Sequence, residues 1–315
     1  MENFVVVIGA GTMGSGIGAM AALAGEKTIL VDVDEARVAA GIEKAKACIR
    51  LRQKNGLNTD EEAAQALGLL GSSTDMNKVV RNASIVIEAI IEKMEAKQAI
   101  FAQLDAVLDT AVPICSNTSG LRITEIAALC KHPERTFTTH FWLPAHLVPL
   151  VEVVMGDYSD ETMAKSVVTR LKGWKKAPVL VRRDLPGQLA NRVFQAIIRE
   201  TIAIVDSGLA SAEDVDTAIS CGMAMRFPEW GPLMHLDAIG LDLGLSVQDA
   251  VLPSINADTT ANGYIRKLVE TGNLGASTGK GFYDWSERSI TDAMNKRDRF
   301  IIEAVKIKTK LDQEG

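Results

Sequence analysis

Two titratable side chains, His140 and Glu152, stand twelve residues apart, each in or at the end of a predicted strand. An imidazole titrates near neutral pH, so His140 could take the proton of a substrate hydroxyl or return it. A carboxylate beside it would fix the tautomer of the ring and stabilise the imidazolium form. Glu152 stands in the apolar run 150–154, where a buried carboxylate needs such a partner. The residues alone leave a second interpretation open, in which His140 is a core residue and Glu152 is exposed on an edge strand.

A glycine motif near the start of the chain is typical of a site for a dinucleotide diphosphate. Three glycines follow the apolar run 4–8 and precede small, helix-compatible residues, which indicates a strand, a tight turn and a helix. In this pattern Gly9 lets the chain reverse, Gly11 lets the backbone approach a pyrophosphate, and Gly14 lets helix and strand pack closely. The free N–H groups at the helix N-terminus attract the anion. The residues we expect to contact the diphosphate are Gly9, Gly11, Thr12, Met13 and Gly14.

Asp32 favours dinucleotide binding over a purely structural turn at the glycines. It closes a second predicted strand, 28–31, eighteen residues after Gly14. A carboxylate at this place can accept hydrogen bonds from both hydroxyls of an adenosine ribose and repels a 2′-phosphate, so we expect NAD as the cofactor. Lys27 and Arg37 lie near Asp32 in the sequence and keep NADP as the alternative.

The composition narrows the class of protein. A chain of 315 residues is long enough for two domains, and its net charge of −6 argues against nucleic acid as a partner. The four cysteines are widely spaced, which fits buried, reduced thiols better than disulfides or a zinc site. The four histidines show no metal-binding spacing, so we expect no metal. The first predicted strand starts at residue 4 and no apolar run approaches the length of a membrane span, so we expect no leader, no membrane contact and a cytoplasmic location.

Strands and helices alternate in the first part of the chain, which predicts an α/β fold with a doubly wound, mostly parallel sheet covered on both faces. The predicted strands are 4–8, 28–31, 69–73, 85–87, 112–115, 136–140, 150–154 and 179–181, and the predicted helices are 34–54, 59–67, 92–108 and 160–173. Ligands of such sheets bind at the carboxyl ends of the strands. Asp32, Glu88, residues 116–119 and His140 all fall at such ends, so we expect one shared site.

Three basic residues, Arg50, Arg52 and Lys54, end the predicted helix 34–54. Cations suit the negative end of the helix dipole. We therefore expect a solvated helix end, with a site for ligand phosphates as the alternative.

The sequence pattern changes at residues 184–187, beyond which helical stretches continue and no strand pattern persists. We expect an NAD-binding domain over residues 1–185 and a helical substrate and dimerisation domain over residues 186–315. The helix predicted at 188–207 has a thick apolar side. A domain of about 130 residues has too small a core to bury such faces, so we expect a homodimer through the helical domain.

Seven motifs occur together in a specific order. They are Gly9-x-Gly11-x-x-Gly14, Glu88-Ala89-Ile90, Ser116-Asn117-Thr118-Ser119, His140-Phe141, Leu150-Val151-Glu152-Val153, Asp184-x-Pro186-Gly187-x-x-x-Asn191-Arg192 and Thr278-Gly279-Lys280-Gly281-Phe282-Tyr283. With these motifs the chain resembles the 3-hydroxyacyl-CoA dehydrogenase family over nearly its full length. The resemblance implies a Rossmann-type NAD domain followed by an all-helical C-terminal domain that forms a dimer.

The resemblance also implies roles for single residues. It makes His140 the general base or acid and Glu152 its orienting partner. Ser119 and Asn191 match positions that hydrogen-bond the substrate oxygen and hold the site together, although the residues alone also allow a turn or helix cap and a helix-surface residue. The positions that match the nicotinamide side of the cofactor site are Glu88, Lys93 and Asn117.

The loop after His140 departs from the family pattern. The fatty-acid enzymes usually carry an aromatic residue, Asn and Pro where this chain has Trp142-Leu143-Pro144, and the segment 144–153 resembles the branch of gulonate and carnitine dehydrogenases and lambda-crystallin. We expect a short-chain 3-hydroxyacyl-CoA of the 3-hydroxybutyryl-CoA type as the substrate, in fatty acid metabolism. A free 3-hydroxy carboxylic acid is the alternative. A non-catalytic, NAD-binding structural protein is a more distant one.

Two further residues are open to two interpretations each. His146 either packs within its loop or binds a substrate carboxylate. Arg226 either meets a carboxylate with both arms of its guanidinium or is an exposed arginine before a turn.

Overall fold

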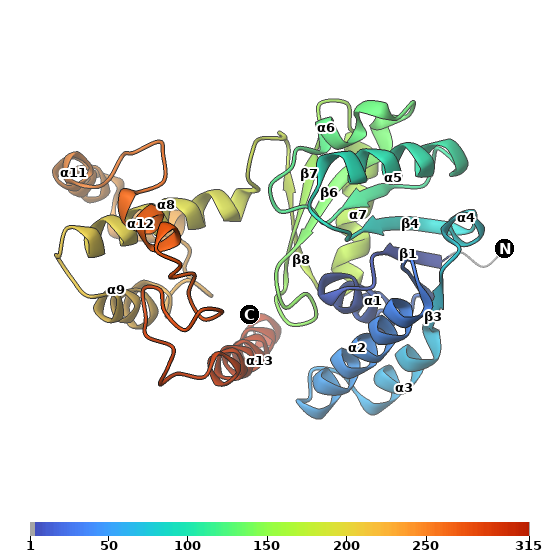
Figure 1. Cartoon of the computed structure of the whole chain (residues 1–315), viewed down its shortest axis with the longest axis horizontal. Coiled ribbons are helices and arrows are strands. Elements are labelled where there is room, and N and C mark those ends of the chain that lie inside the picture. The colour runs from blue at the N-terminus through green and yellow to red at the C-terminus, as the bar shows by residue number, and fades with distance from the viewer. Residues whose placement is uncertain (1–3, 315) are drawn as a thin grey trace. The chain divides into compact units, whose positions relative to one another are not determined.

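The computed structural model describes residues 4–314 and divides into two compact units, with the boundary between Asn191 and Arg192 (Figure 1). The first unit is built around a sheet, and the second is helical. Among residues 4–314, no helix is both long enough and apolar enough to cross a membrane.

An eight-stranded sheet forms the centre of the first unit, in the order β3-β2-β1-β4-β5-β6-β7-β8. Strands β6 and β7 pair antiparallel, and the other neighbouring pairs are parallel. The strands are β1 (Phe4–Ile8), β2 (Thr28–Val31), β3 (Leu70–Ser73), β4 (Ala83–Glu88), β5 (Ile114–Ser116), β6 (Thr136–Phe141), β7 (Leu150–Met155) and β8 (Ala177–Val181). The mostly parallel, doubly wound sheet predicted from the sequence is confirmed.

Helices cover both faces of this sheet (Figure 1). They are α1 (Thr12–Leu23), α2 (Glu35–Lys54), α3 (Asp60–Leu69), α4 (Met76–Val80), α5 (Met94–Val107), α6 (Ile123–Ile126) and α7 (Glu161–Gly173). The packing of β1 explains why its sequence is apolar throughout. Val5 and Val7 pack in a core cluster with α1, α2, α3 and α7, whereas Val6 and Ile8 pack in a second cluster with α4, α5 and α6. Successive side chains of a strand point to opposite faces, so both sets of side chains in a strand covered on both faces are buried, and such strands are mostly apolar.

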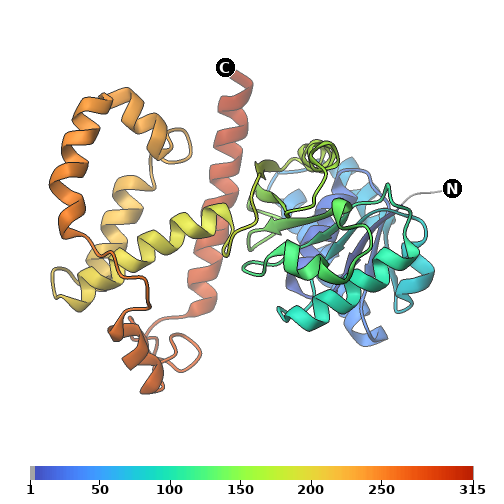
Figure 2. The same ribbon diagram turned by 90° about the horizontal axis from the view of Figure 1, so that it is seen from above.

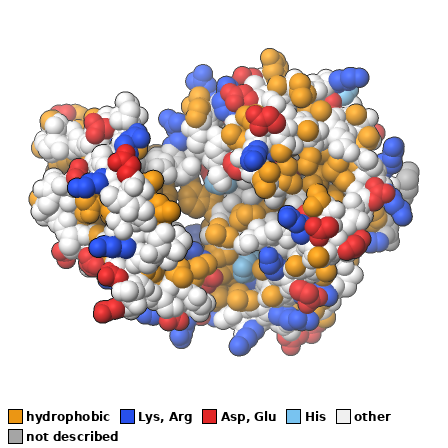
Figure 3. All heavy atoms as spheres, in the orientation of Figure 1, with side chains coloured by type: hydrophobic (Ala, Val, Ile, Leu, Met, Phe, Trp, Pro, Cys, Tyr) orange, Lys and Arg blue, Asp and Glu red, His pale blue; other side chains and the backbone are white. Residues whose placement is uncertain are grey.

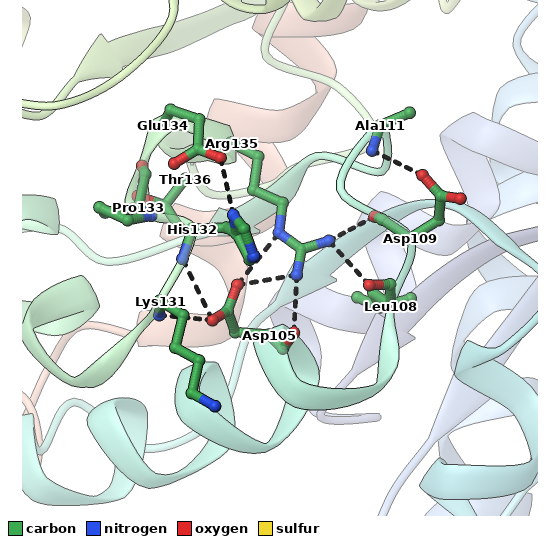
Figure 4. A network of polar contacts seen from close by, with 10 residues as sticks. All are labelled: Asp105, Leu108, Asp109, Ala111, Lys131, His132, Pro133, Glu134, Arg135 and Thr136. Atoms are coloured by element: carbon green, nitrogen blue, oxygen red, sulfur yellow. Dashed lines mark hydrogen bonds and ion pairs between the residues drawn. The ribbon is translucent and has the colours of Figure 1, made fainter.

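A buried ion pair fastens α5 to the segment that leads into β6 (Figure 4). The fully buried guanidinium of Arg135 has Nη2 2.7 Å from Oδ1 of Asp105, and it also donates to the main-chain oxygens of Asp105, Leu108 and Asp109. Burial raises the pKa of Asp105, but the hydrogen bonds and charge of Arg135 and two main-chain N–H groups outweigh it, so this pKa lies below its usual value. Because every donor has an acceptor, the pair holds the start of the strand that carries His140 without an unpaired buried charge.

The described part of the second unit is helical, and α8 leads into it from the first. Figure 2 shows the long C-terminal helix α13 in full. The helices are α8 (Leu189–Asp206), α9 (Ala212–Ala218), the π-helix η3 (Ile219–Met223), α10 (Pro232–Ile239), α11 (Leu241–Val251), the short 3₁₀ helix η4 (Leu252–Ser254), α12 (Gly263–Glu270) and α13 (Ile290–Glu314). The 3₁₀ helices η1 (Ala127–Leu129) and η2 (Pro133–Arg135) lie in the first unit. Within the described residues of the second unit, the β-structure consists of isolated bridges between Gly275 and Lys280 and between Lys280 and Asp284, in agreement with the expected loss of strand pattern.

The burial of the cysteines corrects one expectation from the sequence. All four are free thiols, but Cys115 alone is fully buried, Cys48 and Cys130 are partly buried, and Cys221 is exposed. The prediction of buried thiols is therefore wrong for Cys221, because its helix η3 lies at the surface of the helical unit. The wide spacing of the cysteines in the sequence does not determine their burial.

Acidic and basic side chains are interspersed over the face shown in Figure 3.

Candidate active site

His140 and Glu152 form a hydrogen-bonded pair. They are direct partners in the antiparallel register of β6 and β7, and opposite residues of such a pair point to the same face of the sheet. Nδ1 of His140 lies 2.7 Å from Oε2 of Glu152. Glu152 is fully buried, and β7 lies between β6 and β8. The alternative of an exposed glutamate on an edge strand is therefore wrong.

Two further donors hold the Glu152 carboxylate. The main-chain N–H of Ala190, in the first turn of α8, donates to Oε1 at 2.8 Å, and the indole N–H of Trp142 donates to Oε2 at 3.0 Å. Burial raises the pKa of Glu152, but the hydrogen bonds from His140, Ala190 and Trp142 outweigh burial, so this pKa lies below its usual value. The group is an ionised carboxylate at neutral pH. It engages Nδ1 of the imidazole, so Nε2 is the nitrogen that can exchange a proton with a ligand.

The glycine turn between β1 and α1 has the geometry of an anion site. A Cβ added at Gly14 would lie 1.8 Å from the main-chain oxygen of Gly9, so only glycine lets the helix pack against the turn. A Cβ at Gly11 would meet no atom within 4 Å, which leaves room at the surface for a ligand. Gly11 precedes Thr12, the first residue of α1, and no side chain caps this helix. Its first N–H groups therefore have no intrahelical acceptor and point at this space.

Asp32 lies immediately after β2 and is bonded to the same turn. Its Oδ2 accepts a hydrogen bond of 2.8 Å from the main-chain N–H of Ala10, and Oδ1 accepts one of 2.8 Å from that of Val33. Each carboxylate oxygen has further acceptor capacity, so Asp32 can also receive ribose hydroxyls. The open space at Gly11, the uncapped helix and this half-buried carboxylate together fit an NAD molecule.

Glu88, at the end of β4, is fully buried. Its Oε1 lies 2.7 Å from Nζ of Lys97 and 2.7 Å from the main-chain nitrogen of Ile90, and its Oε2 accepts a hydrogen bond of 2.6 Å from the hydroxyl of Ser116. These partners make Glu88 an anchor that fastens β4 to β5 and α5. Its expected place beside the nicotinamide stays a prediction.

Glu92 and Lys97 were not among the residues predicted for the site. Oε1 of Glu92 accepts hydrogen bonds from the main-chain N–H of Ser119 at 3.0 Å and from the hydroxyl of Thr118, and Oε2 lies 3.3 Å from Nζ of Lys97. Burial raises the pKa of Glu92, but these bonds outweigh it and lower the pKa. Glu92 thus holds the loop that presents the exposed Ser119. Lys93, the next residue, is exposed in front of α5.

The two asparagines predicted for the site are far from His140 and Glu152 in the chain, but each lies at a residue that adjoins or contacts the pair. Oδ1 of Asn117 accepts a hydrogen bond of 2.9 Å from the main-chain N–H of Phe141, which joins the end of β5 to the end of β6. Asn191 is half-buried and follows Ala190, the residue whose N–H binds Glu152. The end of β5 therefore places the Asn117 amide beside the residue that follows His140, and the start of α8 places Asn191 next to a residue bonded to Glu152.

Two buried cations hold the loop between β6 and β7. Nη1 of Arg52, from α2, donates to the main-chain oxygen of His146 at 2.6 Å, 94 residues further along the chain. Lys176, just before β8, donates from Nζ to the main-chain oxygens of Ala145 and Val148. Both interpretations of Arg52 from the sequence, a solvated helix end or a phosphate site, are wrong, because the end of α2 packs against this loop. His146 is half-buried, and Arg226 is exposed in the second unit.

A doubly wound sheet with a glycine turn before α1 and a carboxylate after β2 defines a class of proteins, the dinucleotide-dependent dehydrogenases. The model of the 3-hydroxyacyl-CoA dehydrogenase NAD binding domain matches residues 4–185, and that of the 3-hydroxyacyl-CoA dehydrogenase C-terminal domain matches residues 187–285. The chain belongs to the 3-hydroxyacyl-CoA dehydrogenase family. It is an NAD-dependent dehydrogenase, as its motifs implied.

Individual relatives cover most of the chain. It is 37% identical over 287 residues to a probable 3-hydroxybutyryl-CoA dehydrogenase of Bacillus subtilis, which covers 90% of this chain and 98% of the relative. Its fold matches a crystal structure of (S)-3-hydroxybutyryl-CoA dehydrogenase from Ralstonia eutropha with a TM-score of 0.75 at 33% identity, over 91% of this chain and all of the other. It matches the structure of 5-formyl-3-hydroxy-2-methylpyridine 4-carboxylic acid 5-dehydrogenase, an NAD⁺-dependent dismutase, with a TM-score of 0.90 at 25% identity, over 98% and 99% of the two chains.

Proposed function

We propose that His140 is the general base that takes the hydroxyl proton of a secondary alcohol, and the acid that returns it in the reverse direction. The observation that carries the proposal is the 2.7 Å bond between Nδ1 of His140 and the buried carboxylate of Glu152. This bond fixes the tautomer with Nε2 as the acceptor, and the ionised carboxylate stabilises the imidazolium that forms. NAD, when bound, accepts the hydride from the carbinol carbon.

Neutral hydrogen-bond donors complete the proposed site. We assign Ser119 and Asn191 to the substrate oxygen, where a hydroxyl and an amide can stabilise developing charge without titrating. The support for Ser119 is that Glu92 fixes its main-chain N–H and leaves the residue exposed. The support for Asn191 is its place beside Ala190, which is bonded to Glu152. Asn117 supports this edge through its bond to Phe141 and is a candidate for the nicotinamide amide.

We assign most of the cofactor contacts to the segments that follow β1 and β2. We assign the diphosphate to the N–H groups of α1 beside the glycine turn, at Gly9, Gly11, Thr12, Met13 and Gly14. Asp32 holds the adenosine ribose, and its charge repels a 2′-phosphate. Lys93 immediately precedes α5 and its side chain is exposed, so it is accessible to a bound cofactor.

We propose a short-chain 3-hydroxyacyl-CoA as the substrate, which places the enzyme in fatty acid metabolism. The support is that relatives named 3-hydroxybutyryl-CoA dehydrogenase share 33–37% identity with nearly the whole chain. A second candidate is a free hydroxy acid or another small carboxylate. It is favoured by Leu143, a half-exposed apolar residue where the fatty-acid enzymes usually carry asparagine, and by the TM-score of 0.90 with a dehydrogenase of a pyridine carboxylic acid.

Steady-state kinetics with a panel of substrates separates the two. The panel comprises 3-hydroxybutyryl-CoA, 3-hydroxybutyrate, gulonate, carnitine and the pyridine aldehyde acid named for the structural relative. We expect kcat/KM for the CoA thioester to exceed that for every free acid. Turnover of free acids alone would overturn the acyl-CoA assignment while leaving the roles of His140 and Glu152 intact. If the protein binds NAD but turns over no alcohol, this would favour a structural protein in which His140 has no catalytic role.

We also propose that the helical unit forms a homodimer. Its described surface carries large apolar side chains that are more than half exposed, including Leu233, Leu241, Leu245 and Phe300. Faces of this kind are normally covered by a partner. Light scattering on the purified chain should give twice the mass of 33.9 kDa, and a monomer would contradict this proposal. The domain limits at residue 185 and the cytoplasmic location stay predictions.

A further inference from the structure

Oε2 of Glu152 is shared by two donors from the same segment of chain. The imidazole Nδ1 of His140 lies 2.7 Å from it, and the indole Nε1 of Trp142 lies 3.0 Å from it. The other oxygen, Oε1, is bonded to the main-chain N–H of Ala190. The carboxylate is fully buried, so its hydrogen-bonding capacity is divided among protein groups.

Trp142 also contacts the imidazole directly. Its ring centroid lies 5.7 Å from that of His140, with an angle of 52° between the two planes, which is a tilted contact between aromatic rings. The indole therefore touches both members of the pair, one through its N–H and the other through its ring. In an extended chain, side chains two residues apart point to the same side, which explains why residues 140 and 142 can meet.

We propose that Trp142 is a positioning residue that fixes the Glu152 carboxylate by donating its indole N–H to the oxygen that the imidazole shares, and that it thereby moderates how strongly this oxygen stabilises a protonated imidazole. The inference rests on the proposed function, in which His140 is the base. It goes beyond that function by assigning a third side chain to the pair. A hydrogen bond from the indole withdraws electron density from Oε2, so it reduces the stabilisation that this oxygen gives to an imidazolium.

Among the charged groups near His140, Glu152 faces it across the strands from β7 and is bonded to Trp142. The other neighbouring charges make their contacts without the indole N–H. On β4 and α5, Glu88 and Lys97 are paired with each other, and Asp184 accepts from the main-chain N–H of Thr124. Lys176 lies 5.8 Å from the ring of Phe141, the residue after His140, and successive residues of a strand point to opposite faces. Removal of the indole N–H therefore leaves these other contacts in place.

The test is the substitution Trp142→Phe, which keeps an aromatic ring and removes the N–H. We expect the acidic limb of the pH profile of kcat/KM for alcohol oxidation to move to higher pH by about 0.5 to 1 unit, the size of one modest hydrogen bond. The direction follows because a more basic carboxylate keeps the imidazole protonated to higher pH, and oxidation needs the neutral ring. Trp174→Phe is the matched control, since its indole donates to Oε1 of Glu26 at 2.6 Å in a buried place. It should leave the limb unmoved.

A second readout does not depend on catalysis. The His140 ring signals can be titrated by NMR in the wild-type protein and in W142F, with thermal melting to confirm that both are folded. An upward shift of the titration midpoint in W142F supports the proposal, and an unchanged midpoint overturns it. A shift seen by NMR without a matching shift of the kinetic limb would keep the positioning role of Trp142 and reject His140 as the base.

Discussion

Nζ of Lys176 lies 2.8 Å from the main-chain oxygen of Val148 and also donates to that of Ala145. The ammonium is buried under the loop that joins the two strands of the proposed catalytic pair. Desolvation, with a smaller contribution from the charge of Arg52, lowers the pKa of Lys176 to about 7. A loop of the site thus depends on a lysine that titrates near neutral pH.

This lysine predicts a pH-dependent stability. The folded protein binds the proton of Lys176 less tightly than the unfolded chain, whose lysines titrate near 10.4, so between these values the unfolded state binds more protons. Stability contributed by this group therefore rises with pH from about 7 to about 10. We expect the free energy of unfolding of the wild type, relative to Lys176→Met, to rise by up to about 1.4 kcal/mol per pH unit in this window.

Urea unfolding at several pH values measures this difference. Lys175→Met is the matched control, because Lys175 is exposed and pairs with Glu62 at the surface. Its difference from the wild type should stay nearly constant over the same range. A constant difference for K176M as well would show that the buried amine does not titrate in this window.

The glycine turn predicts opposite outcomes for two similar substitutions. Gly14→Ala would place a methyl group 1.8 Å from the main-chain oxygen of Gly9, so the variant should lose several kcal/mol of stability or fail to fold. Gly11→Ala meets no atom within 4 Å, so the variant should melt near the wild-type temperature. It should bind NAD at least tenfold more weakly, because the methyl group occupies the space left for the diphosphate. Calorimetry of NAD binding and thermal melting check both. Full NAD affinity in folded G11A would contradict the assignment of the diphosphate.

Asp32 predicts the choice between NAD and NADP. Asp32→Asn removes the charge that repels a 2′-phosphate, so the ratio of kcat/KM for NAD to that for NADP should fall by about tenfold or more. Asp34→Asn serves as the control, since Asp34 is two residues away and caps α2 through the main-chain N–H of Arg37. An unchanged ratio in D32N would remove Asp32 from the ribose site.

The sequence predicted those parts of the site that are local in the chain or fixed by strand periodicity. The continuous apolar run 4–8 predicted a strand, the alternation of strands and helices predicted a sheet covered on both faces, and the spacing of His140 and Glu152 matched two adjacent strands. Arg52 was misread, because the pattern of a helix end does not show a contact with a loop 94 residues away. Glu92 and Lys97 were missed for the same reason. Acidic and basic residues at the start of a helix are common on surfaces, and only the packing of α5 buries Lys97.

The most direct test of the central claim is the substitution His140→Asn, with turnover and NAD binding measured on the same preparation. We expect kcat/KM for the alcohol to fall by about 10²- to 10⁴-fold while the affinity for NAD stays near that of the wild type. His132→Asn is the control, because His132 forms an exposed pair with Glu134 outside the site, and it should keep full activity. Wild-type turnover in H140N that binds NAD normally would contradict the account.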